Sequence, residues 1–144
     1  MMSDKRILLF LVDDDALFLK SLEIEFAQSD QYAIRTFATG ELCLDSMAQN
    51  PDIVVLDYYL NGVDETAING LETLDRIKEC SIITPVIMLS SQDSIEVAVN
   101  CMKHHAFDYI VKSETAFIRL QKTISTLLHN QKMEKTLNWY MDKI

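Results

Sequence analysis

Short apolar runs recur along the chain, and amphipathic stretches separate them. Five such runs are typical of strands that are buried on both faces of a sheet. Apolar residues at helical spacing predict a helix after each run. The predicted strands are Ile7–Val12, Tyr32–Phe37, Ile53–Leu56, Pro85–Leu89 and Phe107–Val111. The predicted helices cover residues 16–28, 41–49, about 71–78, 94–104, and a long stretch from about residue 115.

This alternation of strands and helices predicts an α/β fold with a doubly wound parallel sheet. Parallel neighbours need a crossover connection, and a helix is the usual one. In folds of this class, ligands gather beyond the carboxyl ends of the strands. The residues that directly follow each strand are therefore the first place to look for a functional site.

Reactive side chains follow four of the five predicted strands. The acidic run Asp13–Asp15 follows the first strand, Asp57 the third, Ser90 the fourth and Lys112 the fifth. We expect these side chains to converge at one edge of the sheet. Clustered carboxylates repel one another unless a hard divalent cation such as Mg²⁺ neutralises them. A lone carboxylate at Asp57 can attack phosphorus, and the cation, hydroxyl and ammonium groups would then hold the phosphoryl oxygens.

Each of these residues also has an ordinary structural interpretation. Asp15 can cap the helix that follows it, and an aspartate after a strand is commonly a turn residue. A serine pair at such a place is often a helix cap, and Lys112 alone would be a solvated surface lysine. The prediction rests on the acids, the hydroxyl and the amine occurring together, in order, at the ends of these four strands.

With these residues in place, the sequence resembles the receiver domains of two-component response regulators. The resemblance runs from about Lys5 to Leu128 and rests on residues 7–15, 51–57, 85–91 and 106–112. It implies a flavodoxin-like (βα)5 fold with strand order 2-1-3-4-5. It also implies phosphorelay signalling, in which a sensor histidine kinase or a histidine phosphotransfer protein donates a phosphoryl group. The phosphorylated domain would switch a protein-interaction surface on the last two helices and the fifth strand.

The resemblance assigns the metal site and the phosphoacceptor. It implies that Asp57 accepts the phosphoryl group in a reaction that depends on Mg²⁺. Asp13 and Asp14 would hold the metal together with Asp57, and the backbone carbonyl of Tyr59 would be a further ligand.

The same resemblance assigns three residues to phosphoryl binding and switching. Ser90 matches the hydroxyl residue that moves toward the phosphoryl group, and Lys112 matches the lysine that contacts it. Tyr109 matches the aromatic residue whose rotamer reports activation, although a packed core tyrosine is an alternative interpretation.

Several positions depart from the family pattern. Asn61 replaces a proline, and the loop Asn61–Asn69 is longer than usual before Gly70. This loop could contact a partner, shield the phosphoacceptor or be a neutral surface insertion. Ser113 replaces the proline after Lys112, so we expect a trans peptide there. His105 stands where a glycine commonly ends the fourth helix, and a left-handed C-cap is expected for it.

Composition and charge narrow the function classes. The net charge is −9; residues 1–111 carry −12 and residues 112–144 carry +3. The main body should therefore repel nucleic acid, which binds basic surfaces. No apolar run is long enough to cross a membrane, and no secretory signal is evident. The scattered cysteines are expected to be buried or half-buried free thiols, which indicates a reducing cytoplasm. Those cysteines are Cys43, Cys80 and Cys101.

The expected organisation is a receiver domain over residues 1–129 and a helical extension over residues 130–144, with no output domain. Apolar residues in the extension recur at spacings of four, three and four. This pattern could pack on a partner, pair with a second copy of the chain, or begin a linker. These residues are Met133, Leu137, Tyr140 and Ile144.

Two other function classes compete with a phosphoryl-accepting switch. A hydrolase of the haloacid dehalogenase type would attack with Asp57, but it needs a second acid where this chain has Tyr59. A receiver-like interaction module that is not phosphorylated is favoured only by the missing proline at Asn61. We therefore expect a signalling domain that is not an enzyme beyond slow self-dephosphorylation, whose downstream protein target the sequence does not identify.

Overall fold

A computed structural model describes residues 5–144, in which strands and helices alternate. All five predicted strands keep their place to within one residue; the last, for example, begins at Asp108 instead of Phe107. The strands are β1 Ile7–Val12, β2 Tyr32–Phe37, β3 Ile53–Asp57, β4 Val86–Ser90 and β5 Asp108–Val111. The helices are α1 Ala16–Ala27, α2 Gly40–Asp45, α3 Gly70–Cys80, α4 Ile95–Lys103 and α5 Ala116–Lys143.

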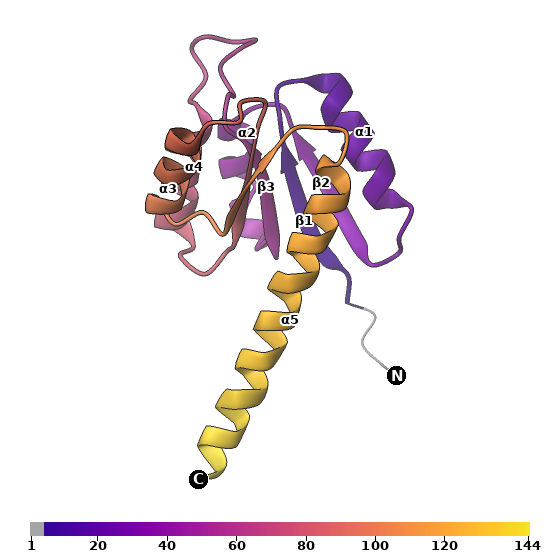
Figure 1. Cartoon of the computed structure of the whole chain (residues 1–144), viewed down its shortest axis with the longest axis vertical. Helices are drawn as coiled ribbons and strands as arrows, with labels where there is room; N and C mark the ends of the chain where they lie inside the picture. The colour runs from indigo at the N-terminus through magenta and orange to yellow at the C-terminus, as the bar shows by residue number, and fades with distance from the viewer. Residues whose placement is uncertain (1–4) are drawn as a thin grey trace. The chain divides into compact units, whose positions relative to one another are not determined.

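The strands form one parallel sheet in the order β2-β1-β3-β4-β5, which confirms the predicted topology. Figure 1 shows α1 on one side of this sheet and α3 with α4 on the other. Val12 pairs with Leu56, and Asp57 pairs with Leu89. This register brings the carboxyl ends of β1, β3 and β4 to one edge, where the sequence predicts the site.

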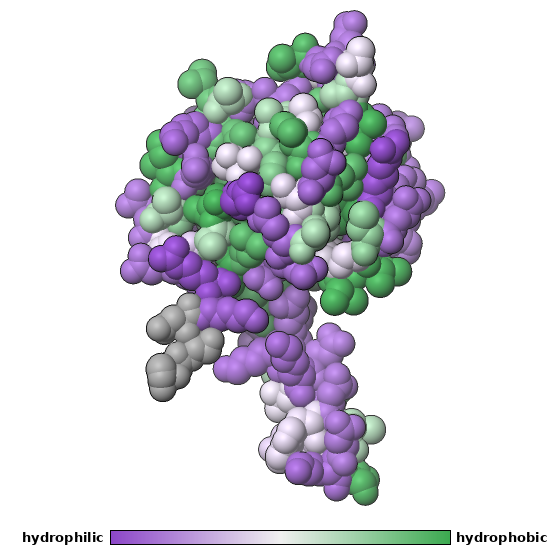
Figure 2. Space-filling model, turned by 180° about the vertical axis from the view of Figure 1, so that it is seen from behind, coloured by the Kyte–Doolittle hydropathy of each residue, from purple (hydrophilic) through white to green (hydrophobic). Residues whose placement is uncertain are grey.

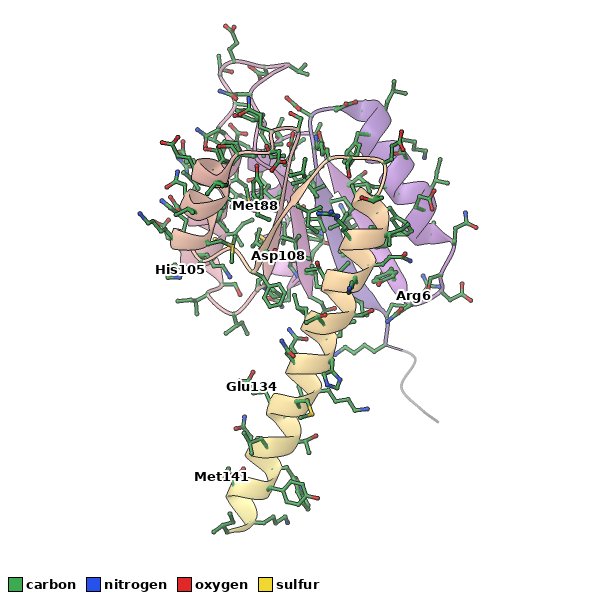
Figure 3. The ribbon with its side chains drawn as sticks, viewed as in Figure 1. Arg6, Met88, His105, Asp108, Glu134 and Met141 are labelled. Atoms are coloured by element: carbon green, nitrogen blue, oxygen red, sulfur yellow. The ribbon has the colours of Figure 1, made fainter. Side chains whose placement is uncertain are left out.

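The strands in the middle of the sheet contribute a large share of the core. The strands β3 and β4 are buried along their whole length, as expected for strands covered on both faces. Met88 of β4, which is labelled in Figure 3, is fully buried. Burying each such side chain contributes about 1.5–3 kcal/mol to folding, so the core fixes the strands that carry the site.

One helical prediction is partly wrong. The helix expected over residues 41–49 divides into α2 and a 3-10 turn, Met47–Gln49, which ends at Asn50 in a left-handed conformation. In α1, Leu22 and Phe26 are buried one turn apart. Leu17 is 85% exposed and Ile24 51% exposed, because these two lie seven residues apart on another face of the helix.

Local capping confirms several smaller predictions. The Asp15 carboxylate accepts hydrogen bonds from the N–H groups of Leu17 and Phe18 and caps α1. His105 has φ 74°, in the left-handed region expected after α4. The described residues contain no cis peptide, so the bond between Lys112 and Ser113 is trans as predicted.

The cysteine prediction holds for two of three residues. Cys43 and Cys101 are buried, whereas Cys80 is exposed at the end of α3. All three are free thiols. On the face seen in Figure 2, hydrophobic residues are interspersed with hydrophilic ones, so exposed apolar side chains are not confined to one element.

The chain divides into two units, one ending at Lys112 and one from Ser113 to Ile144. The second unit is dominated by α5, whose residues Ala116, Leu120, Ile124 and Leu127 are buried. Every residue from His129 onward is exposed, and Glu134 and Met141 mark this part in Figure 3. Among the described residues, no helix combines the length and apolarity that crossing a membrane requires.

Candidate functional site

Three acidic side chains meet beyond the carboxyl ends of β1 and β3. Asp13, Asp14 and Asp57 each offer one carboxylate oxygen, and these oxygens lie within 4.8 Å of one another. Asp13 is 2% exposed and Asp57 is 3% exposed, while Asp14 is half-buried. The Asp13 carboxylate also accepts a hydrogen bond of 2.9 Å from the N–H of Asp15, which orients it. The acids predicted to converge are therefore adjacent.

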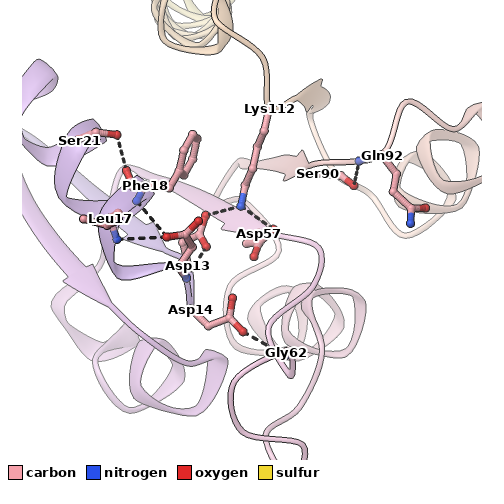
Figure 4. A network of polar contacts seen from close by, with 11 residues as sticks. Asp13, Asp14, Leu17, Phe18, Ser21, Asp57, Gly62, Ser90, Gln92 and Lys112 are labelled. Atoms are coloured by element: carbon pink, nitrogen blue, oxygen red, sulfur yellow. Dashed lines mark hydrogen bonds and ion pairs between the residues drawn. The ribbon is translucent and has the colours of Figure 1, made fainter.

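Lys112 reaches this acidic group from the end of β5. Its Nζ lies 2.7 Å from Oδ2 of Asp13 and 3.3 Å from Oδ1 of Asp57, as Figure 4 shows. The ammonium also stands 4.6 Å from the ring centroid of Phe18, a cation–π contact. Burial opposes the charge on Lys112, but the hydrogen bond and charges of Asp13 and Asp57 outweigh it and raise the pKa.

The surroundings of Asp57 raise the pKa of its carboxyl group well above the ordinary value. Burial, and after it the neighbouring charge of Asp13, raise the pKa of Asp57 to about 7. Lys112 acts in the opposite direction and lowers the pKa. A group with this pKa, at the end of a central strand, has the character of a functional residue.

The donor set suits a small hard cation. Mg²⁺ prefers carboxylate oxygens and keeps several waters, so that two or three carboxylates suffice. Asp13 and Asp57 share a single lysine as countercharge, and their mutual repulsion is what a divalent cation would relieve. Asp13, Asp14 and Asp57 therefore fit magnesium. The role of the Tyr59 carbonyl as a further ligand stays a prediction.

Ser90 ends β4, and Tyr109 lies near the start of the neighbouring strand β5. The buried Ser90 hydroxyl accepts a hydrogen bond of 3.1 Å from the N–H of Gln92. The Tyr109 hydroxyl donates to the backbone carbonyl of Gln92. Burial raises the pKa of Tyr109, and a hydrogen bond with Ser90 partly offsets the rise. The two residues assigned to switching are thus connected through Gln92, in the loop that leads into α4.

Sequence reasoning missed two contributors to the site. The first is Phe18, whose ring lies against the ammonium of Lys112. The second is the start of the loop after β3. The backbone N–H groups of Gly62 and Val63 donate to Oδ2 of Asp14 at 3.0 and 3.2 Å. The unusual length of Asn61–Asn69 was the only signal in the sequence that pointed to this contact.

Comparisons with known proteins agree with this geometry. A family model described as "Response regulator receiver domain" matches residues 9–125. The nitrogen assimilation regulatory protein NtrX of Azorhizobium caulinodans is 33% identical over 103 residues, which cover 71% of this chain and 22% of that protein. The DNA-binding transcriptional regulator NtrC of Escherichia coli strain K12 is 28% identical over 138 residues, covering 93% of this chain and 28% of that protein. The chain thus spans less than a third of the length of these two relatives.

Solved structures give the same picture. A crystal structure of NtrX from Brucella abortus matches with a TM-score of 0.79 and 26% identity, over 93% of this chain and 30% of that one. A BeF3-activated DrrB receiver domain matches with a TM-score of 0.70 and 27% identity, over 84% of this chain and 99% of that one.

Proposed function

The chain belongs to the response regulator receiver domain family, and we propose that it accepts a phosphoryl group on Asp57 in a reaction that depends on Mg²⁺. The observation that carries the proposal is the position of Asp57, buried beside Asp13 and 3.3 Å from the Nζ of Lys112. An oxygen nucleophile in contact with a fixed cation, next to an acidic metal site, is what phosphoryl transfer to a carboxylate requires.

The donor would be a phosphohistidine of a sensor histidine kinase or of a histidine phosphotransfer protein. A carboxylate oxygen of Asp57 attacks phosphorus, a P–O bond forms, and the P–N bond to the donor imidazole breaks. The imidazole leaves with the electron pair and takes up a proton. Bound magnesium would neutralise the charge that develops on the phosphoryl oxygens.

The side chains of the site would have separate roles in binding the metal and the phosphoryl group. Asp13 and Asp14 would hold the metal together with Asp57 and the carbonyl of Tyr59. Lys112 would exchange its contact with Asp57 for one with a phosphoryl oxygen, because the acyl phosphate leaves Asp57 without its own charge. The Ser90 hydroxyl would donate to another phosphoryl oxygen.

The switching step follows from the contacts of Ser90. If Ser90 turns toward the phosphoryl group, its hydrogen bond with the N–H of Gln92 must change. The Tyr109 hydroxyl holds the carbonyl of Gln92, so the loop before α4 would respond. Exposed apolar residues Ile95, Val99 and Met102 line α4 at helical spacing, which favours a protein partner at α4 and β5. The participation of α5 in that surface stays a prediction.

The test is incubation with acetyl phosphate and Mg²⁺, followed by intact-protein mass spectrometry. Wild-type protein should gain the mass of one phosphate, and omission of Mg²⁺ should abolish the gain. Asp57→Asn should not gain it, because an amide is not a nucleophile of this kind. Asp45→Asn, at an exposed aspartate outside the site, should behave as wild type. Phosphate on the Asp57→Asn protein would contradict the assignment, and no gain in wild type would favour a module that is not phosphorylated.

A further inference from the structure

The loop between β3 and α3 is held at both ends by carboxylates from other elements. Near its start, the N–H groups of Gly62 and Val63 donate to Oδ2 of Asp14 at 3.0 and 3.2 Å. Near its end, the N–H of Ile68 donates to Oε2 of Glu41 at 3.1 Å. The inserted segment is therefore a defined strap across the edge of the site, and its first contact is with an acid of the metal site.

Resting on the proposed function, we propose that the backbone of Gly62 and Val63 positions Asp14 for binding the divalent cation. Both hydrogen bonds go to the same oxygen, Oδ2, which leaves Oδ1 for a metal. In Figure 4 the other oxygen of Asp14 lies on the side of Asp13 and Asp57. Backbone donors to a charged carboxylate form strong hydrogen bonds. Such outer contacts orient metal ligands and raise metal affinity.

The strap acts on Asp14 through its backbone. The Val63 side chain is 79% exposed, so packing does not explain why this residue approaches the site. A Cβ added at Gly62 would lie 3.3 Å from Oδ2 of Asp14, which is tighter than an ordinary contact. Glycine at position 62 therefore permits the close approach that brings both N–H groups onto one oxygen. Gly62 and Val63 are positioning residues, since any metal would be held by Asp14.

The direct test removes one donor and leaves the rest of the strap in place. Val63→Pro has no N–H at residue 63 and loses no buried side chain. The matched control is Glu65→Pro, which puts a proline at the second position of the turn closed by the N–H of Ala67 and the carbonyl of Asp64. Proline is favoured at that position of a turn. Working at about 0.15 M salt screens the lost Glu65 charge.

Magnesium affinity is measured by calorimetric titration of wild type and both variants. Val63→Pro should raise the dissociation constant about tenfold, the size expected for losing an outer contact to a metal ligand. Glu65→Pro should keep the wild-type constant. In the acetyl phosphate reaction, Val63→Pro should need more Mg²⁺ for half-maximal rate and should reach the wild-type rate at saturation. Thermal unfolding in EDTA checks that the variant is folded.

A second measurement tests the contact without metal. Amide hydrogen exchange at Gly62 and Val63 should be slow in wild type and faster in Asp14→Ala, because the acceptor is gone. Unchanged exchange, or an unchanged magnesium constant in Val63→Pro, would overturn the positioning role and leave the proposed function intact. Absence of magnesium binding in wild type would instead overturn the metal part of the proposed function, and the positioning role with it.

Discussion

At the scale of single residues, Asp57 combines a buried position with two opposing charged neighbours. Asp13 and desolvation disfavour its ionised form, and Lys112 favours it. The balance leaves the pKa near neutrality, well above the ordinary value of a carboxyl group. An ionised Asp57 is therefore costly to the folded protein in the absence of metal, which suits a site that gains stability when a cation or a phosphoryl group arrives.

We expect this cost to appear as a pH dependence of stability in EDTA. The pKa of Asp57 is about 7 when folded and near its ordinary 3.8 when unfolded. Between these values the folded protein binds more protons, so its contribution to stability falls as pH rises from about 4 to about 7. Asp57→Asn removes this loss, so the variant should be more stable than wild type at pH 7.5 by at least about 1 kcal/mol.

Urea denaturation followed by circular dichroism at pH 5 and pH 7.5 measures the difference. The advantage of Asp57→Asn should be smaller at the lower pH. Lys112 keeps Asp13 as its partner in the variant, so the change leaves no unpaired ammonium. An advantage that is equal at both pH values would show that desolvation of Asp57 is not its source.

At the scale of elements, helix ends place the site residues. Asp15 caps α1 directly after Asp13 and Asp14, and Asn69 caps α3 at the end of the strap. After the C-terminal end of α4, His105 adopts φ 74°, and the chain turns toward β5. The side chain of its neighbour His104 contacts Asp75 at 2.7 Å, which joins α4 to α3. His104 is half-buried.

Replacing His105 by glycine should stabilise the protein by about 0.5–1 kcal/mol. A residue with a Cβ pays for the left-handed conformation, while glycine adopts it without steric cost and loses some of the gain to backbone entropy. Thermal unfolding measures the shift. His105→Ala serves as control, because it removes the imidazole and keeps the Cβ. If alanine stabilises as much as glycine, the backbone conformation is not the reason.

At the scale of the whole chain, the two units carry different kinds of residues. The unit ending at Lys112 contains every described residue of the proposed site. In the second unit, burial along α5 stops after Leu127. The exposed remainder carries apolar residues, including Leu137, Trp139 and Tyr140. The division into a receiver over 1–129 and an extension over 130–144, and pairing of the extension with a second copy, stay predictions.

Removing residues 130–144 should therefore cost little stability. No residue of that segment is buried, and deleting exposed positions changes the free energy of unfolding by about 0.5 kcal/mol or less. Leu127→Ala in the full chain is the contrast, with an expected loss of about 2–5 kcal/mol for a buried leucine. Urea denaturation of wild type, the truncated chain and Leu127→Ala measures these differences in the free energy of unfolding. A truncated chain that is as unstable as Leu127→Ala would place part of the extension within the folded domain.

The sequence alone determined the strands, the sheet order expected from the family resemblance, and the convergence of Asp13, Asp14, Asp57 and Lys112. These follow from local patterns, because a buried strand needs a continuous apolar run and parallel strands end at one edge. Only the tertiary structure decided which apolar residues of α1 face solvent and that Gly62 and Val63 bind Asp14. The reason is physical: these contacts join segments 48 and 49 residues apart, and no local period along the chain encodes such a distance.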